Sequence, residues 1–560
     1  MNISIISTSD IEGGAAIAAF RLLKGLREIQ QDAVMAVRGK TSGHPDVYRV
    51  VFAAPRFSAE QKIFRSIQHM EIERNRSELS NTRFSFPYPG YDLSRTETIA
   101  ASDVINLHWI AEFQSVETIA ALLQLGKPVV WTLHDEYAYS GGCHYTAGCL
   151  KYRRDCSDCP QLKDNSLRIP FHVLQNKLKL WQDNLTIVTP SKWLAECAKK
   201  SRVFKNLRVE VIPNSVETHI YKPQAKEAAK AQLGIDPQVV TLLFGAYTGF
   251  EKRKGFSKLL AAVKHCLRDP KFKNLSRQGG IKILTYGPPQ EDLEELDIEI
   301  ESTGYVDDMA KLAQIYSAAD IFVLPSLEDN LPNTMVEAMA CGTPVIGFAA
   351  GGIPDMVADG VTGYTAPCPD VEKLGDLILQ LVFDENLRRE MTLNCRRLIE
   401  QGYRLRDQAG NYLELFNDLL KNKKTAAGNS DQGKSSSMLL EKREILLNER
   451  NTGYQEQFFD IYRRHAPEVI AGREAQLSQK NEVIKQKDAL IKQRDALIKK
   501  KDELIARKNE VIKQGDRNIL KLYRSPTFRI GKLATFPFRK IKGLYKKIKG
   551  PARSPGSRKR

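Results

Sequence analysis

The stretch from Pro325 to Gly363 reads PSLEDNLPNTMVEAMACGTPVIGFAAGGIPDMVADGVTG and follows a short apolar run, residues 321–324. The apolar run predicts a buried strand, and the residues from about Pro332 to Met339 predict a helix after a polar loop. Proline suits the first position of a helix, because the N–H that it lacks would have no partner there. The free N–H groups and positive dipole at a helix start suit a phosphate. The stretch therefore predicts an anion site between a strand and a helix.

Two acids of this stretch, Asp329 and Glu337, are eight residues apart, which is about two helical turns. A carboxylate before the helix and a second one within it could hold two parts of one ligand. The alternative is a pair of ordinary surface acids, because acid pairs are common on helices. The residues around the pair favour the interpretation that these two acids bind a ligand.

The order of an acid after Pro-Ser, eight residues, Glu337, then AMACGTPVIG and GGIPD resembles the donor-site signature of retaining glycosyltransferases of family 4. The resemblance implies an α/β protein of the GT-B fold, with two Rossmann-like domains facing a cleft. It also implies that Asp329 faces the hydroxyls of a donor sugar and that Glu337 holds the nucleotide ribose. The other donor-site residues that it implies in this stretch are Glu328, Asn330 and Asn333.

The sequence departs from the commonest family pattern at two points. Asp329, flanked by Glu328, stands where the family usually has Glu, and Leu331 and Pro332 replace the usual Phe and Gly. Pro332 cannot donate an N–H, so one backbone contact near the phosphates must come from elsewhere. The Asp-Asn-Leu-Pro variant resembles colanic-acid and capsule polysaccharide glycosyltransferases, which indicates an active enzyme.

The chain of 560 residues is 42% hydrophobic, which fits two or three domains with full cores. Its formal charge of +17 lies near one end, because residues 473–560 contain 27 Lys and Arg against 8 Asp and Glu. The first residues, MNISIISTSD, lack a basic segment followed by a long apolar run. No stretch approaches the roughly 20 apolar residues that span a bilayer, so we expect a cytoplasmic chain.

The first predicted domain covers residues 1–216 and opens with a strand near residues 3–6, a loop with Gly13 and Gly14, and a helix. This order predicts the first unit of a Rossmann-like domain, in which glycines let a ligand approach the backbone. In the family that the chain resembles, the acceptor and the donor phosphate meet at this loop. Residues from about 40 to 91 lack a clear pattern, and we expect them to be variable and mobile.

Two apolar runs, residues 103–110 and 128–135, carry His108 and His134 near their ends. Both histidines are therefore predicted at the carboxyl ends of parallel strands, where open α/β sheets bind ligands. A structural role is the alternative for each. His134, in Thr-Leu-His-Asp, matches a family position that contacts the donor sugar.

A cysteine-rich insertion is predicted over residues 141–160. Four of the nine cysteines fall within it at spacings x5, x6 and x2, and in a reducing compartment such a cluster more often binds metal than forms disulfides. The spacing predicts a structural zinc site, with His144 as a substitute for one thiolate; the alternative is four reduced thiols. The predicted ligands are Cys143, Cys149, Cys156 and Cys159.

The second predicted domain covers residues 217–420, after an Ile-Pro-Asn segment that resembles the interdomain linker of the family. Its first strand leads to Lys252, Arg253 and Lys254 before a helix. Bases at a helix start oppose the helix dipole, so they indicate an anion there, although a solvated charge run is the alternative. The family resemblance assigns an Arg and a Lys of this loop to the donor diphosphate. It also implies that the backbone of Tyr305 and Val306 pairs with the nucleotide base.

The remainder of the chain divides into a polar linker (421–437), a helical extension (438–522) and a basic tail (523–560). Adjacent apolar pairs recur every seven residues from Leu477, which predicts a long helix that self-associates weakly through residues 477–520 or pairs with a partner helix. From Lys521 onward there are 14 Lys and Arg and no acid, interleaved with aromatic and aliphatic residues. The tail therefore predicts docking on an anionic membrane surface; nucleic acid and a solvated tail are the alternatives.

Together these features predict a retaining glycosyltransferase that moves a sugar from a UDP- or GDP-sugar to a lipid-linked or polysaccharide acceptor in bacterial surface polysaccharide biosynthesis. The predicted catalytic residues are His134, Asp329, Arg253 and Lys254, with no cofactor needed for catalysis. The predicted location is the cytoplasmic face of the cell membrane. Two other functions remain open: a nucleotide-sugar epimerase of the same fold, and a non-enzymatic coiled-coil scaffold.

Overall fold

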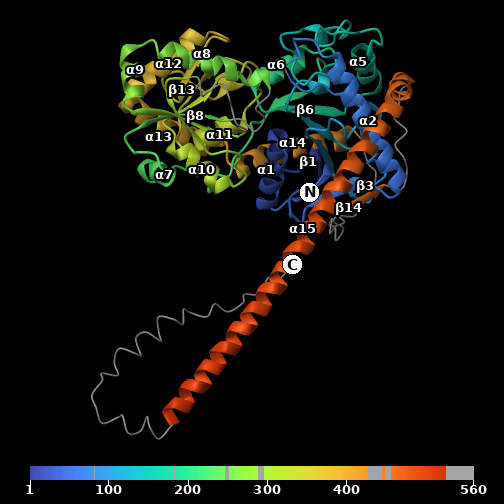
Figure 1. Ribbon diagram of the computed structural model, residues 1–560. Helices are drawn as coiled ribbons and strands as arrows, with labels where there is room; N and C mark the ends of the chain where they lie inside the picture. The colour runs from blue at the N-terminus through green and yellow to red at the C-terminus, as the bar shows by residue number, and fades with distance from the viewer. Residues whose placement is uncertain are drawn as a thin grey trace. The chain divides into compact units, whose positions relative to one another are not determined.

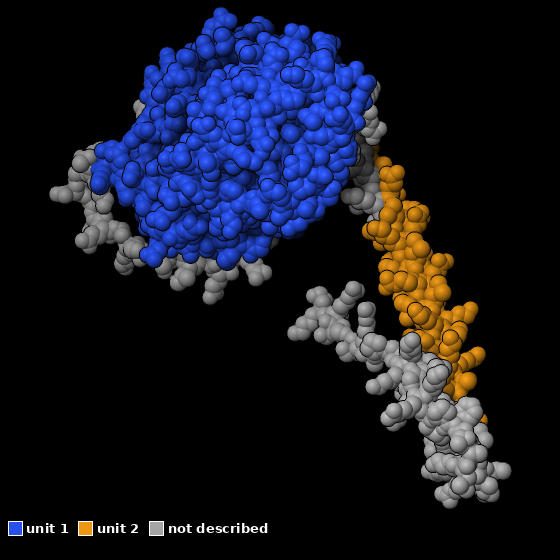
Figure 2. Space-filling view, turned by 90° about the vertical axis from the view of Figure 1, so that its left-hand side faces the viewer, with its two compact units in different colours: residues 1–469 blue, residues 470–560 orange. Residues whose placement is uncertain are grey.

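The computed structural model describes residues 1–80, 82–181, 184–245, 251–287, 296–426, 444–447 and 456–524. Contacts divide the chain into two compact units, residues 1–469 and 470–560, which Figure 2 shows in different colours. The first unit contains two separate sheets, and every strand pair in both sheets is parallel (Figure 1). Each sheet has helices on both faces. This is the arrangement of two Rossmann-like domains that the sequence predicts.

The first sheet has the strand order β14-β3-β2-β1-β4-β5-β6-β7. Successive residues of a strand point to opposite faces, so Val130 packs with α1 and α14 while Val129 and Trp131 pack on the other face with α4, α5 and α6. The strands are β1 (Asn2–Ser9), β2 (Asp32–Gly39), β3 (Val47–Phe52), β4 (Val104–Leu107), β5 (Val129–Thr132), β6 (Leu185–Thr189), β7 (Val209–Val211) and β14 (Glu444–Leu447). The helices are α1 (Gly14–Glu28), α2 (Pro55–Asn75), α3 (Glu97–Ala100), α4 (Val116–Gln124), α5 (Ile169–Leu180), α6 (Lys192–Lys200) and α14 (Leu405–Ala426).

The second sheet has the strand order β10-β9-β8-β11-β12-β13. Helices α8, α9 and α12 pack on one face and α10, α11 and α13 on the other. The strands are β8 (Val240–Gly245), β9 (Ile281–Tyr286), β10 (Glu299–Ser302), β11 (Ile321–Leu324), β12 (Val345–Phe348) and β13 (Gly363–Ala366). The helices are α7 (Lys226–Gln232), α8 (Phe256–Cys266), α9 (Pro270–Arg277), α10 (Met309–Ala318), α11 (Asn333–Ala340), α12 (Val371–Phe383) and α13 (Glu385–Gly402).

One expectation for local structure is wrong. The sequence predicts a helix over residues 439–451, whereas residues 444–447 form β14 and pair in parallel with β3. The open edge of β3 offers backbone partners, and such tertiary pairing overrides helix propensity. Residues 40–91 include β3 and the 21-residue helix α2, and their expected variability and mobility stay predictions.

A buried cation joins the two sheet domains. Arg21 on α1 is 1% exposed; its Nε lies 2.7 Å from a carboxylate oxygen of Glu217, and its Nη2 lies 2.8 Å from one of Glu337 on α11. Lys24 also pairs with Glu217. Burial alone would raise the pKa of Glu217, but the charges of Arg21 and Lys24 outweigh it and lower that pKa to about 2. The two ion pairs of Arg21 thus connect α1 to α11 and to the segment that follows the first sheet.

Replacing Arg21 with Met should lower the free energy of unfolding by about 3–5 kcal/mol, because the buried carboxylate of Glu337 would lose its cation and Glu217 would lose one of its two. The measurement is calorimetric or urea unfolding at pH 7. Arg27→Ala is the matched control on the same helix: Arg27 pairs with Asp32 at 3.2 Å but is 41% exposed, so its loss should cost about 0–1 kcal/mol. Equal losses in the two variants would contradict this account of Arg21.

Helix α15 (Glu456–Arg524) is a continuous helix of 69 residues. The residues from 482 to 515 are all exposed. Within the described part of the chain, no helix combines the length and the apolar composition needed to cross a bilayer. The predicted basic tail lies outside the described residues from position 525 onward, as does the predicted linker from position 427.

Candidate functional site

A cavity of about 450 Å³ lies between the two sheet domains, at the carboxyl ends of their strands. Loops after β1, β4 and β5 form one wall, and loops after β8 and β11 with the start of α11 form the other. Ligands of open α/β sheets bind at this end of the strands. The predicted site residues that line the cavity are Gly13, Gly14, His134, Arg253, Lys254, Asp329, Asn330, Asn333 and Glu337.

The glycine loop after β1 meets the start of α11. Gly13 has a φ of 92° and is the residue before α1, a conformation that other residues rarely adopt. Asn333 donates a hydrogen bond from its side-chain amide to the carbonyl of Gly14 at 2.8 Å. Asn214 binds the Asn333 side chain at 3.2 Å from the segment between the domains. The first and second domains therefore touch directly at this side of the cavity.

The second wall contains a compact cluster of charge. Lys254 Nζ lies 2.6 Å, and Arg253 Nη1 3.5 Å, from the same oxygen of Asp329. Burial would raise the pKa of Asp329, but the two cations outweigh it and hold that pKa below its usual value. Asp329 is thus ionised and pairs with both bases predicted to bind the diphosphate. The neighbouring Lys252 is exposed and does not line the cavity.

The loop that holds Asp329 and Asn330 is fixed by the glycines of GGIPD. Gly351 has a φ of 58°, and a Cβ there would overlap the carbonyl of Asp329. The N–H of Gly352 donates to that carbonyl at 3.0 Å. Asn330 in turn reaches the first domain, because its side chain accepts from Ser191 Oγ at 2.6 Å and donates to the carbonyl of His134 at 3.3 Å. The two glycines are needed for this close approach of backbone to backbone.

Glu337 lies on α11, two turns beyond Asp329, as predicted. One oxygen accepts from Arg21, and the other accepts from the hydroxyl of Tyr316 at 3.2 Å. Burial raises the pKa of Glu337 above its usual value in spite of Arg21. The carboxylate is held in a fixed orientation at the edge of the cavity.

His134 follows β5 and pairs with His108, which follows β4: Nδ1 of His108 lies 3.0 Å from Nε2 of His134. Nε2 of His108 faces Oδ1 of Asn106 at 2.9 Å, and an amide oxygen only accepts. His108 therefore carries its proton on Nε2 and accepts from His134, which leaves Nδ1 of His134 as an acceptor. Burial lowers the pKa of His134 to about 4 and also lowers that of His108. Both rings are neutral at pH 7.

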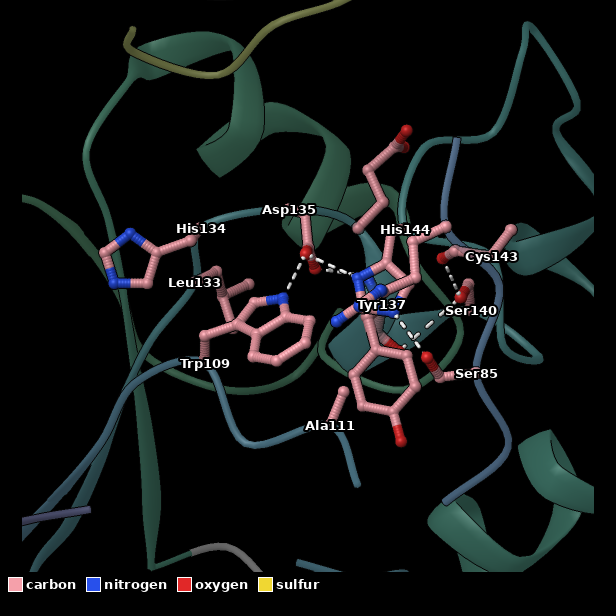
Figure 3. A network of polar contacts seen from close by, with 12 residues as sticks. Ser85, Trp109, Ala111, Leu133, His134, Asp135, Tyr137, Ser140, Cys143 and His144 are labelled. Carbon is pink, nitrogen blue, oxygen red and sulfur yellow. Dashed lines mark hydrogen bonds and ion pairs between the residues drawn. The ribbon is translucent and has the colours of Figure 1, made fainter. Parts of the chain in front are cut away.

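Asp135, next to His134, is held by three donors (Figure 3). Oδ2 accepts from Trp109 Nε1 at 2.8 Å and faces His144 Nδ1 at 2.7 Å, and Oδ1 accepts from the backbone N–H of Tyr137 at 3.0 Å. Nε2 of His144 lies 3.1 Å from Ser85 Oγ. Burial would raise the pKa of Asp135, but His144 and these hydrogen bonds lower it. Oδ1 keeps a free acceptor position for a ligand hydroxyl.

The cavity is also lined by Asp135, Trp109 and Tyr145, which are not among the predicted site residues, and by His144, which is predicted as a substitute metal ligand. The position of Asp135, directly after His134 at a strand end, was the available signal. Tyr145 lies beneath Arg253, whose guanidinium carbon is 4.4 Å from its ring centroid. Aromatic and carboxylate groups on the first-domain wall are suited to a sugar.

Three predicted donor residues are not among those that line the cavity. Glu328 accepts from the backbone N–H of Ala147 at 3.2 Å, so it reaches the cysteine-rich insertion instead. Tyr305 is 69% exposed, and Val306 is 3% exposed within the core of the second domain. Their donor roles stay predictions.

The structure does not show the predicted zinc site, which stays a prediction. Among the described residues, no group of three or more His, Cys, Asp or Glu is arranged to hold a metal ion. His144, the substitute ligand, binds Asp135 and Ser85. Without a metal, burial raises the pKa of Cys156 to about 12 and also raises the pKa of Cys143 and Cys159. All four residues of the motif are free thiols around one small cavity: Cys143, Cys149, Cys156 and Cys159.

Comparison with solved structures defines the fold class first. The structure of Anabaena HepE in complex with UDP and glucose superposes with a TM-score of 0.50 at 15% sequence identity, and the match covers 74% of this chain and 99% of that one. At this identity the likeness shows the fold alone. The chain has the GT-B fold, with two parallel-sheet domains and a helical C-terminal region.

Sequence comparison then identifies the second domain. Residues 239–384 match the family described as Glycosyl transferases group 1, so the chain contains a domain of that type. D-inositol 3-phosphate glycosyltransferase of Segniliparus rotundus is 33% identical over 170 residues, which is 28% of this chain and 35% of that protein. N-acetyl-alpha-D-glucosaminyl L-malate synthase of Bacillus anthracis is 25% identical over 372 residues, which is 65% of this chain and 87% of that protein.

Because His134 is neutral in the folded chain, stability should depend on pH between about 4 and 6.5. In that window the unfolded chain binds a proton at this histidine and the folded chain does not, so stability should fall as the pH falls. Unfolding by urea at pH 7 and pH 5 measures the loss. His134→Gln should reduce the loss, whereas His69→Gln, at a histidine whose side chain is 78% exposed, should leave it unchanged. A larger loss in His134→Gln would show that the ring is charged in the fold.

Proposed function

We propose that the chain is a retaining glycosyltransferase that transfers a sugar from a nucleotide diphosphate sugar to a lipid-linked or glycan acceptor in bacterial surface polysaccharide biosynthesis. The observation that carries the proposal is the position of Arg253, Lys254, Asp329 and Glu337 around one cavity within a glycosyl transferase group 1 domain. The names of the matched relatives, a glycosyltransferase and a synthase, support the same reaction class.

The donor diphosphate would bind between Arg253, Lys254 and the N-terminus of α11. Arg suits a bidentate grip on phosphate oxygens and Lys a point-charge contact. As the bond to the sugar breaks, negative charge grows on the diphosphate, and these fixed cations stabilise it in a site shielded from water. The cations are already paired with Asp329, so the diphosphate would replace one anion with another.

Asp329, Glu337 and His134 would hold the donor. The diphosphate takes over the cations, which leaves the Asp329 carboxylate free to accept from sugar hydroxyls. Glu337 would accept from the ribose, and Nδ1 of His134 accepts from a further sugar hydroxyl. The acceptor hydroxyl would attack from the side of the leaving group, on the wall formed by Trp109 and Asp135, so the configuration is retained.

A thermal-shift screen of UDP-, GDP- and ADP-sugars should give one clear stabiliser, and it tests the donor site. Lys254→Met should weaken the binding of that sugar nucleotide at least tenfold, about 1.4 kcal/mol, because a cation that lines the cavity is lost. The matched control is Lys252→Met in the same run, where the lysine is exposed and away from the cavity. Each shift is measured against the ligand-free melting temperature of the same variant.

Two results would contradict the proposal. The absence of any stabiliser across the panel would favour a scaffold, and equal weakening in both lysine variants would remove Lys254 from the site. Release of a changed sugar nucleotide without an acceptor, detected by NMR, would instead identify an epimerase.

We also propose that residues 523–560 hold the chain on an anionic membrane surface, because 14 Lys and Arg alternate with aromatic and aliphatic residues from Lys521 onward. Deletion of residues 525–560 should abolish co-sedimentation with vesicles that contain roughly 30% phosphatidylglycerol, and leave the donor-induced thermal shift unchanged. Full binding by the shortened chain would refute this role of the tail.

A further inference from the structure

Helix α15 presents a stripe of exposed apolar side chains. Five adjacent pairs recur at intervals of seven residues, and their exposure ranges from 47% to 71%. Single exposed apolar residues are common on proteins, whereas a long contiguous stripe marks an interaction surface. The pairs are Val483 and Ile484, Leu490 and Ile491, Leu497 and Ile498, Leu504 and Ile505, and Val511 and Ile512.

The period of the stripe indicates the shape of its partner. On a straight helix, a strict seven-residue repeat drifts by about 20° per repeat, so the stripe would turn by about 80° between the first and last pairs. A flat surface would therefore meet only part of it. The repeat stays on one side only if the helix supercoils around another helix. The period thus favours a helical partner over a membrane.

A row of bases runs along the middle of the stripe. Lys487 is four residues after Val483 and three after Ile484, and it precedes Leu490 and Ile491 by three and four. Side chains at these spacings are neighbours on a helix, so the lysine lies among four apolar side chains. The same spacing recurs for the other members of this row, which we call the basic row: Lys487, Arg494, Lys501 and Lys508.

The basic row opposes pairing with a second copy, because the seam would bring like charges together with little water around them. These side chains are exposed, and within residues 482–515 the one ion pair joins Lys485 to Glu482, outside the basic row. We propose that this face of α15 pairs with a helix of another protein that has its own seven-residue apolar repeat and a row of Asp or Glu along its seam. This pairing is independent of the proposed sugar transfer.

The chain itself supplies a probe for this partner. A full-length variant with Lys487→Glu, Arg494→Glu, Lys501→Glu and Lys508→Glu has the same apolar pairs and an acidic row. If the proposal is right, this acidic-row variant should bind the unmodified chain at least tenfold more tightly than either chain binds itself. Sedimentation of differently labelled copies of the 63.2 kDa chain measures all three affinities. Far-UV circular dichroism checks that the variant helix is intact.

A charge-matched control distinguishes specific pairing through the stripe from general electrostatic attraction between the two chains. Lys485, Lys492, Lys499 and Lys513 lie one residue after the second member of an apolar pair, about 150° from the middle of the stripe. Replacing these four lysines with Glu changes the charge equally but should not produce binding to the unmodified chain.

Three outcomes would overturn the proposal. Self-association of the unmodified chain that equals or exceeds its binding to the acidic-row variant would identify a second copy as the partner. Equal binding by the control variant would mean non-specific attraction. No pairing at all, combined with loss of binding to vesicles containing roughly 30% phosphatidylglycerol in the acidic-row variant alone, would assign the stripe to lipid.

Discussion

The arrangement of the cleft depends on one buried cation, Arg21. A charged guanidinium removed from water is tolerated only when its partners are present and well placed, so the fold requires both Glu217 and Glu337 beside Arg21. The two helices that Arg21 connects also meet at the cavity. Helix α1 begins at the glycine loop and α11 begins at Asn333. A hydrogen bond from the Asn333 side chain to the carbonyl of Gly14 joins these two helix starts. The spacing of these two helix starts therefore depends in part on Arg21, a residue that does not itself line the cavity.

The charged groups around the cavity are already paired with one another. Lys254 and Arg253 are compensated by Asp329, and Asp135 by His144 and the donors around it. Lys254 and Asp329 need not change their protonation states for an anionic ligand to enter, because the charge of each already balances the other. Binding of a diphosphate as proposed would be an exchange of partners, and the energetic cost of separating Lys254 from Asp329 would favour ligands that offer hydroxyls to the freed carboxylate. Selectivity for a sugar nucleotide over free diphosphate would arise in this way.

The sequence predicts the parts of the fold that depend on local pattern. The apolar run at residues 321–324 and the proline at 332 place β11 and the start of α11 within one residue, because burial and capping are local constraints. The positions of His134, Asp329 and Glu337 at the cavity follow from strand ends and helical spacing in the same way.

The rest depends on contacts between distant residues. Arg21 and Glu337 are 316 positions apart, and the pairing of Asp135 with His144 needs the insertion to fold back over β5. The spacing of the four cysteines predicts a metal site, but it does not predict the buried surroundings that raise the pKa of three of these thiols. The helix expected over residues 439–451 is wrong for the same reason, since the partner of β14 lies some 400 residues earlier, in β3.

Strand β14 has a consequence for how the protein must be handled. Without it, β3 would be the last strand of the first sheet and would present a row of unpaired backbone N–H and C=O groups. Such an open edge is a template for pairing between molecules. A shortened chain that stops after α14 would retain both sheet domains and the whole cavity, yet it would be the form most prone to aggregate. A shortened chain that keeps the cavity and remains dispersed should extend at least to Leu447.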